Sequence, residues 1–476
     1  MTRTGALLLI ALAVGAVWRV GPAPPFPPPA FAQAPAPLDW VKLSDEAVEN
    51  LRAYLRFDTQ NPPANVSAAA AFLRCLLEKE GFQVRVYEPA PGKVNLLARL
   101  KGTGVRKPVL LLNHLDVVPV DASRWKVPPF GGVVQEGKIW GRGAMDMKGL
   151  GMIELMALVA LKRAGSSGSG PALERDIIFL ATADEETGGQ WGALWMINNH
   201  YAELDPEYVL DEGGFGTRDI LAPGRLVYGI SVADKRPFWV RVIAQGTSGH
   251  GSQPIADNAN VILMNALARV LDRPQPAAEI PLVRLMRQKM GGTFAQNKFT
   301  NAIQRNTISL TALRAGVGDP PKANVIPSHS EAILDCRLLP GESPEEFLRK
   351  LKEAAAEPRV KMEVIYVSAP NLVSSSETPF YATIERVLGR HSAGAGAGAG
   401  PGATVVAPIM VPYGTDGNSF RNRGATVYGF SPMVVDLAAL SSMHSDQEHI
   451  PLDEFKKAVR ILFDILSEFS SAQAAR

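Results

Sequence analysis

Three consecutive carboxylates, Asp184, Glu185 and Glu186, directly follow an apolar stretch in the segment LATADEETGG. Adjacent like charges repel one another, and burial near a strand end makes each negative charge more costly. A cation bound there would offset this cost, because one carboxylate could ligate a metal ion while its neighbour acted as a general base. A solvated acidic loop is the commoner role of such a run, so the triplet alone does not establish a metal site.

Two other segments carry side chains of the types that bind metal ions. In NHLDVVPV, His114 and Asp116 lie two residues apart at an expected strand end, so their side chains share a face. That spacing suits a histidine ligand whose ring is held by a nearby carboxylate. In WGRGAMDMKGLG, Asp146 lies among glycines directly before an expected helix, where it could bridge two cations or simply cap the helix. Each motif taken alone is more often structural.

The segments LDEGG and MHSDQEHI supply two more possible ligands, Asp211 at another expected strand end and His444 in a loop before the last helix. His449 could take the place of His444, although it lies closer to that helix. Nitrogen and carboxylate ligands of this kind suit two zinc ions that share one carboxylate and keep an open position. The whole set therefore predicts a pair of metal ions, whose positive charge would offset the repulsion between the carboxylates.

These residues can meet only if the strands that carry them end at the same edge of one sheet. Four short apolar runs have a length that suits strands buried on both faces, and they lie at 109–116, 176–186, 207–214 and 425–432. Helical patterns lie between the runs, an alternation typical of a mainly parallel α/β sheet covered on both sides. In such sheets the site lies beyond the carboxyl ends of the strands, where the candidate residues fall.

The middle of the chain has a different pattern. Strands are expected at 238–246, 306–313, 331–341 and 361–367, and helices near 257–272 and from Pro344 onward. Their β-α-β-β-α-β order is that of a ferredoxin-like α+β fold. We therefore predict a catalytic domain in two parts, 38–232 and 369–476, with the α+β domain inserted at 233–368. The segment 273–305 has too little periodicity for an assignment.

The composition limits the possible partners. A chain of 476 residues is too long for one ordinary core, which agrees with two domains. A net charge of +2 gives no electrostatic case for binding nucleic acid. Two cysteines, Cys75 and Cys336, cannot form a disulfide scaffold, and we expect them to be unpaired because they fall in different domains. The Gly-Ala repeat at 393–403 is of low complexity and is expected to be a surface loop.

The first 32 residues have the features of a signal peptide. Arg3 precedes the apolar run GALLLIALAVGAVW, and AFA before Gln33 matches the small-x-small pattern of a cleavage site near Ala32. The run is short for a membrane span, so export to the periplasm or the exterior is expected. An uncleaved membrane anchor is the alternative, because the spacer between the run and the cleavage site is long.

The order and spacing of HLDVVPV, IWGRGAMDMKG, ATADEETGG, LDEGG and SGHGSQP resemble the co-catalytic zinc aminoacylases and carboxypeptidases of metallopeptidase family 20, most of all the carboxypeptidase S branch. The resemblance covers about 45–470. It implies two Zn²⁺ ions per chain, for which Co²⁺ or Mn²⁺ can substitute. The residues it implies are His114 and Asp211 on one zinc, Glu186 and His444 on the other, Asp146 between them, Glu185 as general base and Asp116 orienting His114.

In the inserted lid domain, the resemblance assigns His250 of GTSGHGSQP to stabilisation of the oxyanion. In dimeric members this histidine comes from the partner subunit, so a homodimer through the inserted domain is possible. Asn324 and Arg337 match positions that hold the free carboxylate of the substrate, and the arginine fork suits such a group. The alternative for Arg337 is an ion pair with Asp335 on one face of an exposed strand.

The activity implied is hydrolysis of the amide bond of N-acyl amino acids or short peptides, next to a C-terminal residue with a free carboxylate. The attacking hydroxide would lie between the two zinc ions and be activated by Glu185. An N-deacetylase and a fatty-acyl amino acid hydrolase or synthase are alternatives within the family. A secreted binding protein without catalysis is an alternative from another class. The sequence contains neither G-x-S-x-G nor H-E-x-x-H, which disfavours a serine hydrolase and a zincin.

Overall fold

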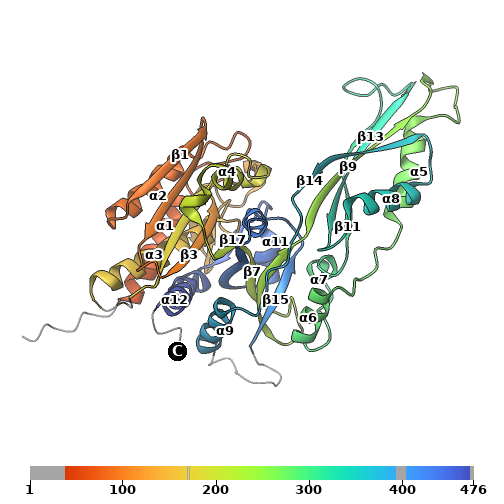
Figure 1. Cartoon of the computed structure of the whole chain (residues 1–476). Coiled ribbons are helices and arrows are strands. Elements are labelled where there is room, and N and C mark those ends of the chain that lie inside the picture. The colour runs from red at the N-terminus through yellow and green to blue at the C-terminus, as the bar shows by residue number, and fades with distance from the viewer. Residues whose placement is uncertain (1–37, 169, 171, 393–403, 472–476) are drawn as a thin grey trace, which may run out of the picture.

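In the computed structural model the described residues are 38–168, 170, 172–392 and 404–471. The expected signal peptide and the Gly-Ala repeat lie outside these described residues. The larger part of the protein is built around an eight-stranded sheet (Figure 1). Its strands, in order across the sheet, are β1 (Val84–Ala90), β2 (Lys93–Leu100), β6 (Arg175–Thr182), β3 (Arg106–His114), β7 (Tyr208–Arg218), β16 (Thr426–Val435), β8 (Leu226–Asp234) and β15 (Val405–Val411).

The predicted mainly parallel α/β sheet is confirmed. β3 pairs in parallel with β6 and β7, β16 pairs in parallel with β7, and β15 pairs in parallel with β8. Every residue of β6 is buried, as is expected of a strand covered on both faces. His114 lies opposite Thr182 in the register of β3 and β6, so the segments after both strands emerge at the same edge.

Helices cover both faces of this sheet. On one face, α1 and α12 pack around α3, which is buried over most of its length. On the other, α4 and α10 pack over apolar residues of β3 and β6. The helices of this part are α1 (Trp40–Tyr54), α2 (Ser67–Lys79), α3 (Lys148–Ser166), α4 (Ala193–Leu204), α9 (Pro379–His391), α10 (Gly417–Arg421), α11 (Leu437–Ser442) and α12 (Leu452–Ser470).

Four strands between β8 and β15 form a separate antiparallel sheet, here called the lid sheet. Its strands, in order, are β11 (Thr307–Arg314), β13 (His329–Leu338), β9 (Arg236–Gln245) and β14 (Val360–Val367). Helices α5 (Ala259–Leu271) and α8 (Pro344–Ala355) cover one face, completing the expected ferredoxin-like order. The segment that had no assignment contains α6 (Pro281–Lys289) and α7 (Lys298–Ala302).

Short elements complete the described structure. A three-stranded sheet joins β17 (His449–Pro451), β5 (Lys138–Trp140) and β4 (Val133–Gln135), and a small ribbon at the lid tip joins β10 (Gly249–His250) to β12 (Val325–Ile326). Single 3-10 turns are η1 (Ala122–Arg124) and η2 (Glu185–Thr187). Cys75 and Cys336 are both free, as expected. Among the described residues, no helix has the length and apolar character needed to cross a membrane.

Candidate active site

One carboxylate, that of Asp146, lies between two histidines. Its Oδ1 is 3.1 Å from Nε2 of His114, at the end of β3, and its Oδ2 is 2.9 Å from Nε2 of His444, in the turn after α11. Asp146 itself lies in the turn before α3. The two oxygens therefore face different histidines, which is the arrangement needed for a carboxylate that bridges two cations.

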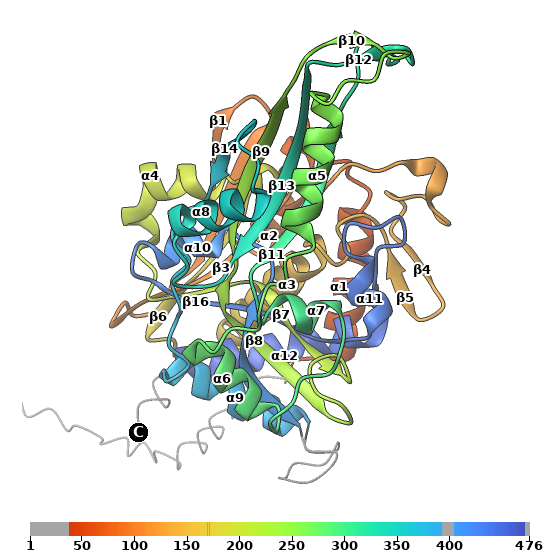
Figure 2. The same ribbon diagram turned by 90° about the vertical axis from the view of Figure 1, so that its right-hand side faces the viewer.

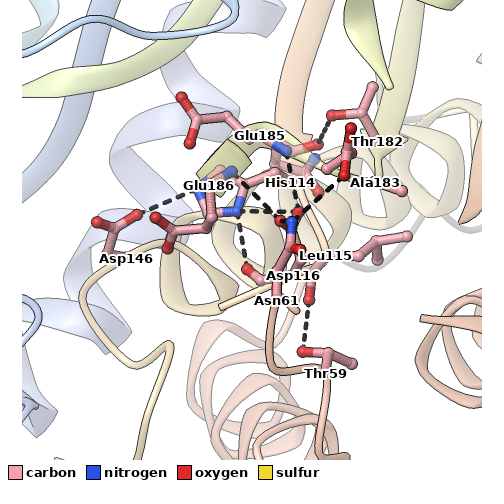
Figure 3. A network of polar contacts seen from close by, with 12 residues as sticks. Thr59, Asn61, His114, Leu115, Asp116, Asp146, Thr182, Ala183, Glu185 and Glu186 are labelled. Atoms are coloured by element: carbon pink, nitrogen blue, oxygen red, sulfur yellow. Dashed lines mark hydrogen bonds and ion pairs between the residues drawn. The ribbon is translucent and has the colours of Figure 1, made fainter. Parts of the chain in front are cut away.

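Two groups of potential ligand atoms meet at this carboxylate and at His114. One group contains His114, Asp146 and Glu186, and the other contains His114, Glu185 and Glu212, with the ligand atoms of each group within 4.8 Å of one another. Oε2 of Glu186 is also 3.4 Å from Nε2 of His444. Figure 3 shows Asp146, Glu185 and Glu186 around the His114 ring. The structure therefore brings together five of the predicted residues at one edge of the sheet.

The structure places Glu212, and not the predicted Asp211, beside His114. Asp211 and Glu212 are neighbours on β7, so their side chains point in opposite directions. Oε1 of Glu212 lies 3.8 Å from Nε2 of His114. Asp211 instead accepts a hydrogen bond from the backbone N–H of Gly417, with 2.8 Å between the two atoms, and belongs to neither ligand group. The motif LDEGG offers both carboxylates, and only the strand register decides between them.

Asp116 acts mainly on the loop that carries Glu185 and Glu186. Its carboxylate accepts the backbone N–H groups of these two residues at 3.2 and 3.3 Å, and the side-chain amide of Asn61 at 2.8 Å. The expected contact with His114 exists, but Nδ1 of the ring lies 2.9 Å from the backbone oxygen of Asp116 and 3.8 Å from its carboxylate. Asp116 thus orients the ring through its carbonyl and the acidic loop through its side chain.

The first carboxylate of the acidic triplet is structural. Asp184 forms an ion pair with Lys93 at 2.9 Å and accepts hydrogen bonds from the Thr187 hydroxyl and the Trp191 backbone. Its backbone is left-handed, with a φ of 73°. This conformation starts the turn η2, and the side chain of Asp184 holds that turn closed. Asp184 therefore pairs with Lys93, whereas Glu185 and Glu186 lie in the two groups around His114, and the sequence motif did not separate these roles.

Glu448 is a site residue that the sequence reasoning missed. Its Oε1 accepts the backbone N–H groups of Gly143, Met145 and Asp146 at 3.1, 2.9 and 3.0 Å. Its Oε2 lies 2.6 Å from Nη1 of Arg142, and both charged side chains are buried. Glu448 thus ties the loop that follows His444 to the turn that carries Asp146. A second acidic residue in MHSDQEHI was the available signal.

The histidine considered as an alternative to His444 does not lie in the cluster. His449 is buried in β17, where its ring packs against Trp140 in a tilted arrangement, with 4.6 Å between centroids. Its Nδ1 lies 2.7 Å from the backbone oxygen of Gln447. His444, in contrast, contacts both Asp146 and Glu186. The structure therefore favours His444.

The cluster has an excess of negative charge. Burial raises the pKa of Glu212 well above its ordinary value, and the charges of Asp146 and Glu185 raise it further. Burial lowers the pKa of His444, but its contacts with Asp146 and Glu186 outweigh burial and raise the pKa to about 10. Among the described residues, Oε1 of Glu186 is buried without a hydrogen-bond partner. Two divalent cations would neutralise this charge and satisfy that oxygen, so the donor set fits a dinuclear metal site.

His250 and Asn324 lie far from this cluster. His250 is exposed at the end of β10, next to Ser252, and the backbone oxygen of Asn324 accepts a hydrogen bond from Gly251 at 2.7 Å. Figure 2 shows β10 and β12 at the top, at the tip of the lid, well above β3 and β7. The structure therefore places these two predicted residues beside each other but not at the ligand cluster of their own chain.

Arg337 forms the ion pair that was its alternative interpretation. Its Nε and Nη2 donate to the two carboxylate oxygens of Asp335 at 2.8 and 3.0 Å. Oδ1 of Asp335 also accepts the indole N–H of Trp239 at 3.1 Å. The fork of Arg337 is therefore already engaged, and its predicted contact with a substrate carboxylate has no separate support from the geometry.

Comparisons with known proteins agree with this site. The family model described as "Peptidase family M20/M25/M40" matches residues 110–468. The chain is 27% identical to "Probable carboxypeptidase S-like 2" of Dictyostelium discoideum over 76% of this chain and 71% of that protein. It is 28% identical to the bovine "N-fatty-acyl-amino acid synthase/hydrolase PM20D1" (79% and 77% covered) and to the pig "Aminoacylase-1" (90% and 96% covered). Among solved structures, an M20 family metallo-carboxypeptidase from Sulfolobus solfataricus superposes with a TM-score of 0.69 at 18% identity, covering 90% of this chain and 99% of that one.

Proposed function

This chain belongs to the peptidase family M20/M25/M40 and is a metallohydrolase of that family, and from this premise we propose its substrate and mechanism. The proposed reaction is hydrolysis of the amide bond of N-acyl amino acids or short peptides, beside a C-terminal residue with a free carboxylate. The observation that carries the proposal is the carboxylate of Asp146 between His114 and His444, with Glu185 in the adjoining group.

The described residues would hold two zinc ions. His114, Asp146 and Glu212 would hold one, and Asp146, Glu186 and His444 the other. Zinc ions bound there would polarise the substrate carbonyl and lower the pKa of a water molecule. Co²⁺ or Mn²⁺ could substitute, because nitrogen and oxygen donors accept several divalent ions.

Glu185 is the proposed general base. The N–H of its own backbone is fixed by Asp116, so the side chain is carried by a loop that is anchored to the strand end of His114. Glu185 would take a proton from the attacking water and later give it to the leaving amine. We expect Glu185→Gln to abolish turnover while zinc content stays at the wild-type value. Retained turnover would refute this role.

We also propose that the oxyanion donor comes from a second copy of the chain. His250 and Asn324 lie at the lid tip, away from the cluster of their own chain (Figure 2). On the lid helix α5, Val261 is 49% exposed and Met264 is 63% exposed. A homodimer interface would bury these apolar side chains. In such a dimer each lid would reach the site of its partner.

A mixing experiment tests this arrangement. Glu185→Gln and His250→Ala should each be inactive alone, but heterodimers would contain one site with both residues intact. A one-to-one mixture with free subunit exchange should then recover about a quarter of wild-type activity. A mixture that stays inactive although mass spectrometry detects heterodimers would refute donation across the interface.

Substrate class is tested with N-acyl amino acids, each paired with its C-terminal amide. Cleavage of the free acids alone would support the carboxypeptidase or aminoacylase hypothesis. Equal cleavage of the acids and their amides would indicate a deacetylase. The similarity to the bovine N-fatty-acyl-amino acid synthase/hydrolase supports a fatty-acyl amino acid hydrolase or synthase as the second candidate. The full set of ligands together with Glu185 argues against a binding protein without catalysis.

We propose in addition that the protein is exported and loses its first 32 residues. The support is the sequence pattern around Ala32. Mass spectrometry of the exported protein should find a chain that begins at Gln33. A mature protein that retains Arg3 would instead favour the membrane-anchored alternative.

A further inference from the structure

One row of side chains runs across the open face of the lid sheet. Asp335 on β13, Trp239 on β9 and Tyr366 on β14 are cross-strand neighbours. Helices α5 and α8 cover the opposite face, on the side turned away from β3 and β7 (Figure 1). The row therefore lies on the face of the lid that is turned toward the catalytic part of the protein.

Trp239 and Tyr366 form an aromatic pair held in one orientation. Their ring centroids are 4.8 Å apart, and the indole N–H of Trp239 donates to Asp335. Because its polar atom is satisfied, the indole has only hydrocarbon surface left to cover, yet the residue is 38% exposed. Asp335 also occupies the fork of Arg337, so the row presents apolar surface rather than a free cation.

This pair reaches the loop that carries the proposed general base. A Cβ atom added to Gly188 would lie 3.8 Å from the hydroxyl oxygen of Tyr366. Gly188 is the residue directly after the turn η2, which begins at Glu185. Burial raises the pKa of Tyr366, and the negative charge of Glu185 raises it further, which agrees with this proximity. A second contact lies beside it, where a Cβ atom on Gly414 would be 3.3 Å from the ring of Pro237.

We propose that Trp239 and Tyr366 form a subsite for an apolar group of the substrate, next to the scissile amide. The group is aliphatic or aromatic, and it can be the acyl chain or the side chain of the amino acid. This inference rests on the proposed function for the identity of the substrate. It adds that selectivity among substrates is set by the lid, through contact with the two rings.

The test compares two substrate series with the zinc-loaded enzyme. One series lengthens the acyl group at a fixed amino acid, and the other enlarges the side chain at a fixed acetyl group. The preference in each series is the kcat/KM for the larger substrate divided by the kcat/KM for the smaller one. Trp239→Ala should lower this ratio by about tenfold in one of the two series. The series that responds identifies the group that binds. Trp239→Phe, which keeps a ring, should retain most of the preference.

Trp195→Ala is the matched control, because it removes a partly buried indole that packs on Tyr87 and His200 of the catalytic part. It should leave both ratios unchanged. Ratios unchanged by Trp239→Ala in both series would overturn the inference.

Binding to the Glu185→Gln protein separates this inference from the proposed function. Calorimetry with both series should show the same loss of preference when Trp239→Ala is added. If Trp239→Ala lowers the binding preference but the wild-type enzyme turns over neither series, the subsite is supported and the proposed hydrolase activity is refuted. Turnover by wild type with no change in either preference would discard the subsite alone.

Discussion

Replacement of Glu448 by glutamine would test how the bridging carboxylate is held. The Glu448 carboxylate accepts three backbone N–H groups from the turn 143–146 and pairs with Arg142. Glutamine has nearly the same shape but one acceptor oxygen and no charge. Whichever way the amide is placed, either the turn or Arg142 would face an NH₂ group in place of an oxygen.

The size of the effect follows from burial. Glu448 is 0% exposed and Arg142 is 2% exposed, so Glu448→Gln leaves a buried cation without its counter-charge. Removal of one partner of such a pair costs about 3–5 kcal/mol of unfolding free energy. Loss of the contact that positions a metal ligand should in addition weaken zinc binding by about 10–100-fold.

Two assays separate these effects. Urea unfolding of the metal-free protein measures stability, and calorimetric titration measures zinc affinity. The double variant Arg142→Met/Glu448→Gln removes the unpaired cation and should recover much of the stability, but not the zinc affinity. As a control, the partly exposed surface pair of Arg106 and Glu174 can be neutralised in the same way, with a cost of about 0–1 kcal/mol. Wild-type zinc affinity in Glu448→Gln would refute a positioning role for this residue.

Three further predictions concern the ligands, the metal and Lys235, which lies between β8 and β9. Glu212→Gln should reduce zinc content toward about one ion per chain by elemental analysis, whereas Asp211→Asn should leave it near the wild-type value; the opposite result would restore Asp211 as the ligand. Chelation should lower the melting temperature, because the carboxylates then repel one another, and added zinc should restore it; a melting temperature insensitive to chelation would contradict the charge argument. Burial lowers the pKa of Lys235 from 10.5 to about 7, with the positive charge of Arg337 acting in the same direction. The folded state therefore binds fewer protons than the unfolded state between these pH values, so stability should rise with pH in this window. In Lys235→Met, the free energy of unfolding measured with urea should rise less between these pH values. The same rise with pH in both proteins would refute the lowered pKa of Lys235.

The strands that carry the site were predictable because their burial leaves a simple pattern. Residues 109–112 form a continuous apolar run, and each of them is buried in β3. Parallel pairing then brings the end of β3 beside the end of β6, and with it His114 beside the acidic loop. Both steps depend on local composition and on a general property of parallel sheets.

The details that the sequence did not predict depend on single-residue geometry or on long-range contacts. Asp211 and Glu212 are both acidic and adjacent, and only the pleat of β7 selects the one that faces His114. Glu448 accepts backbone N–H groups of a turn about 300 residues earlier in the chain, and a sequence pattern does not reveal which side chain accepts from distant backbone donors. The remote position of His250 depends on the length and direction of the lid.

The strand order of the large sheet has a consequence for how the chain folds during synthesis. β16 lies between β7 and β8, although the whole lid, α9 and β15 separate it from β8 in the sequence. β7 and β8 pair directly only over 216–218 and 226–228, so the rest of the centre of the sheet remains open until the C-terminal part of the chain is available. The lid sheet has all its strands earlier. Such non-local pairing slows folding and prolongs exposure of apolar strands. A nascent chain would therefore hold a complete lid beside an unfinished catalytic sheet, a state that chaperones can engage before His444 reaches Asp146 and Glu186.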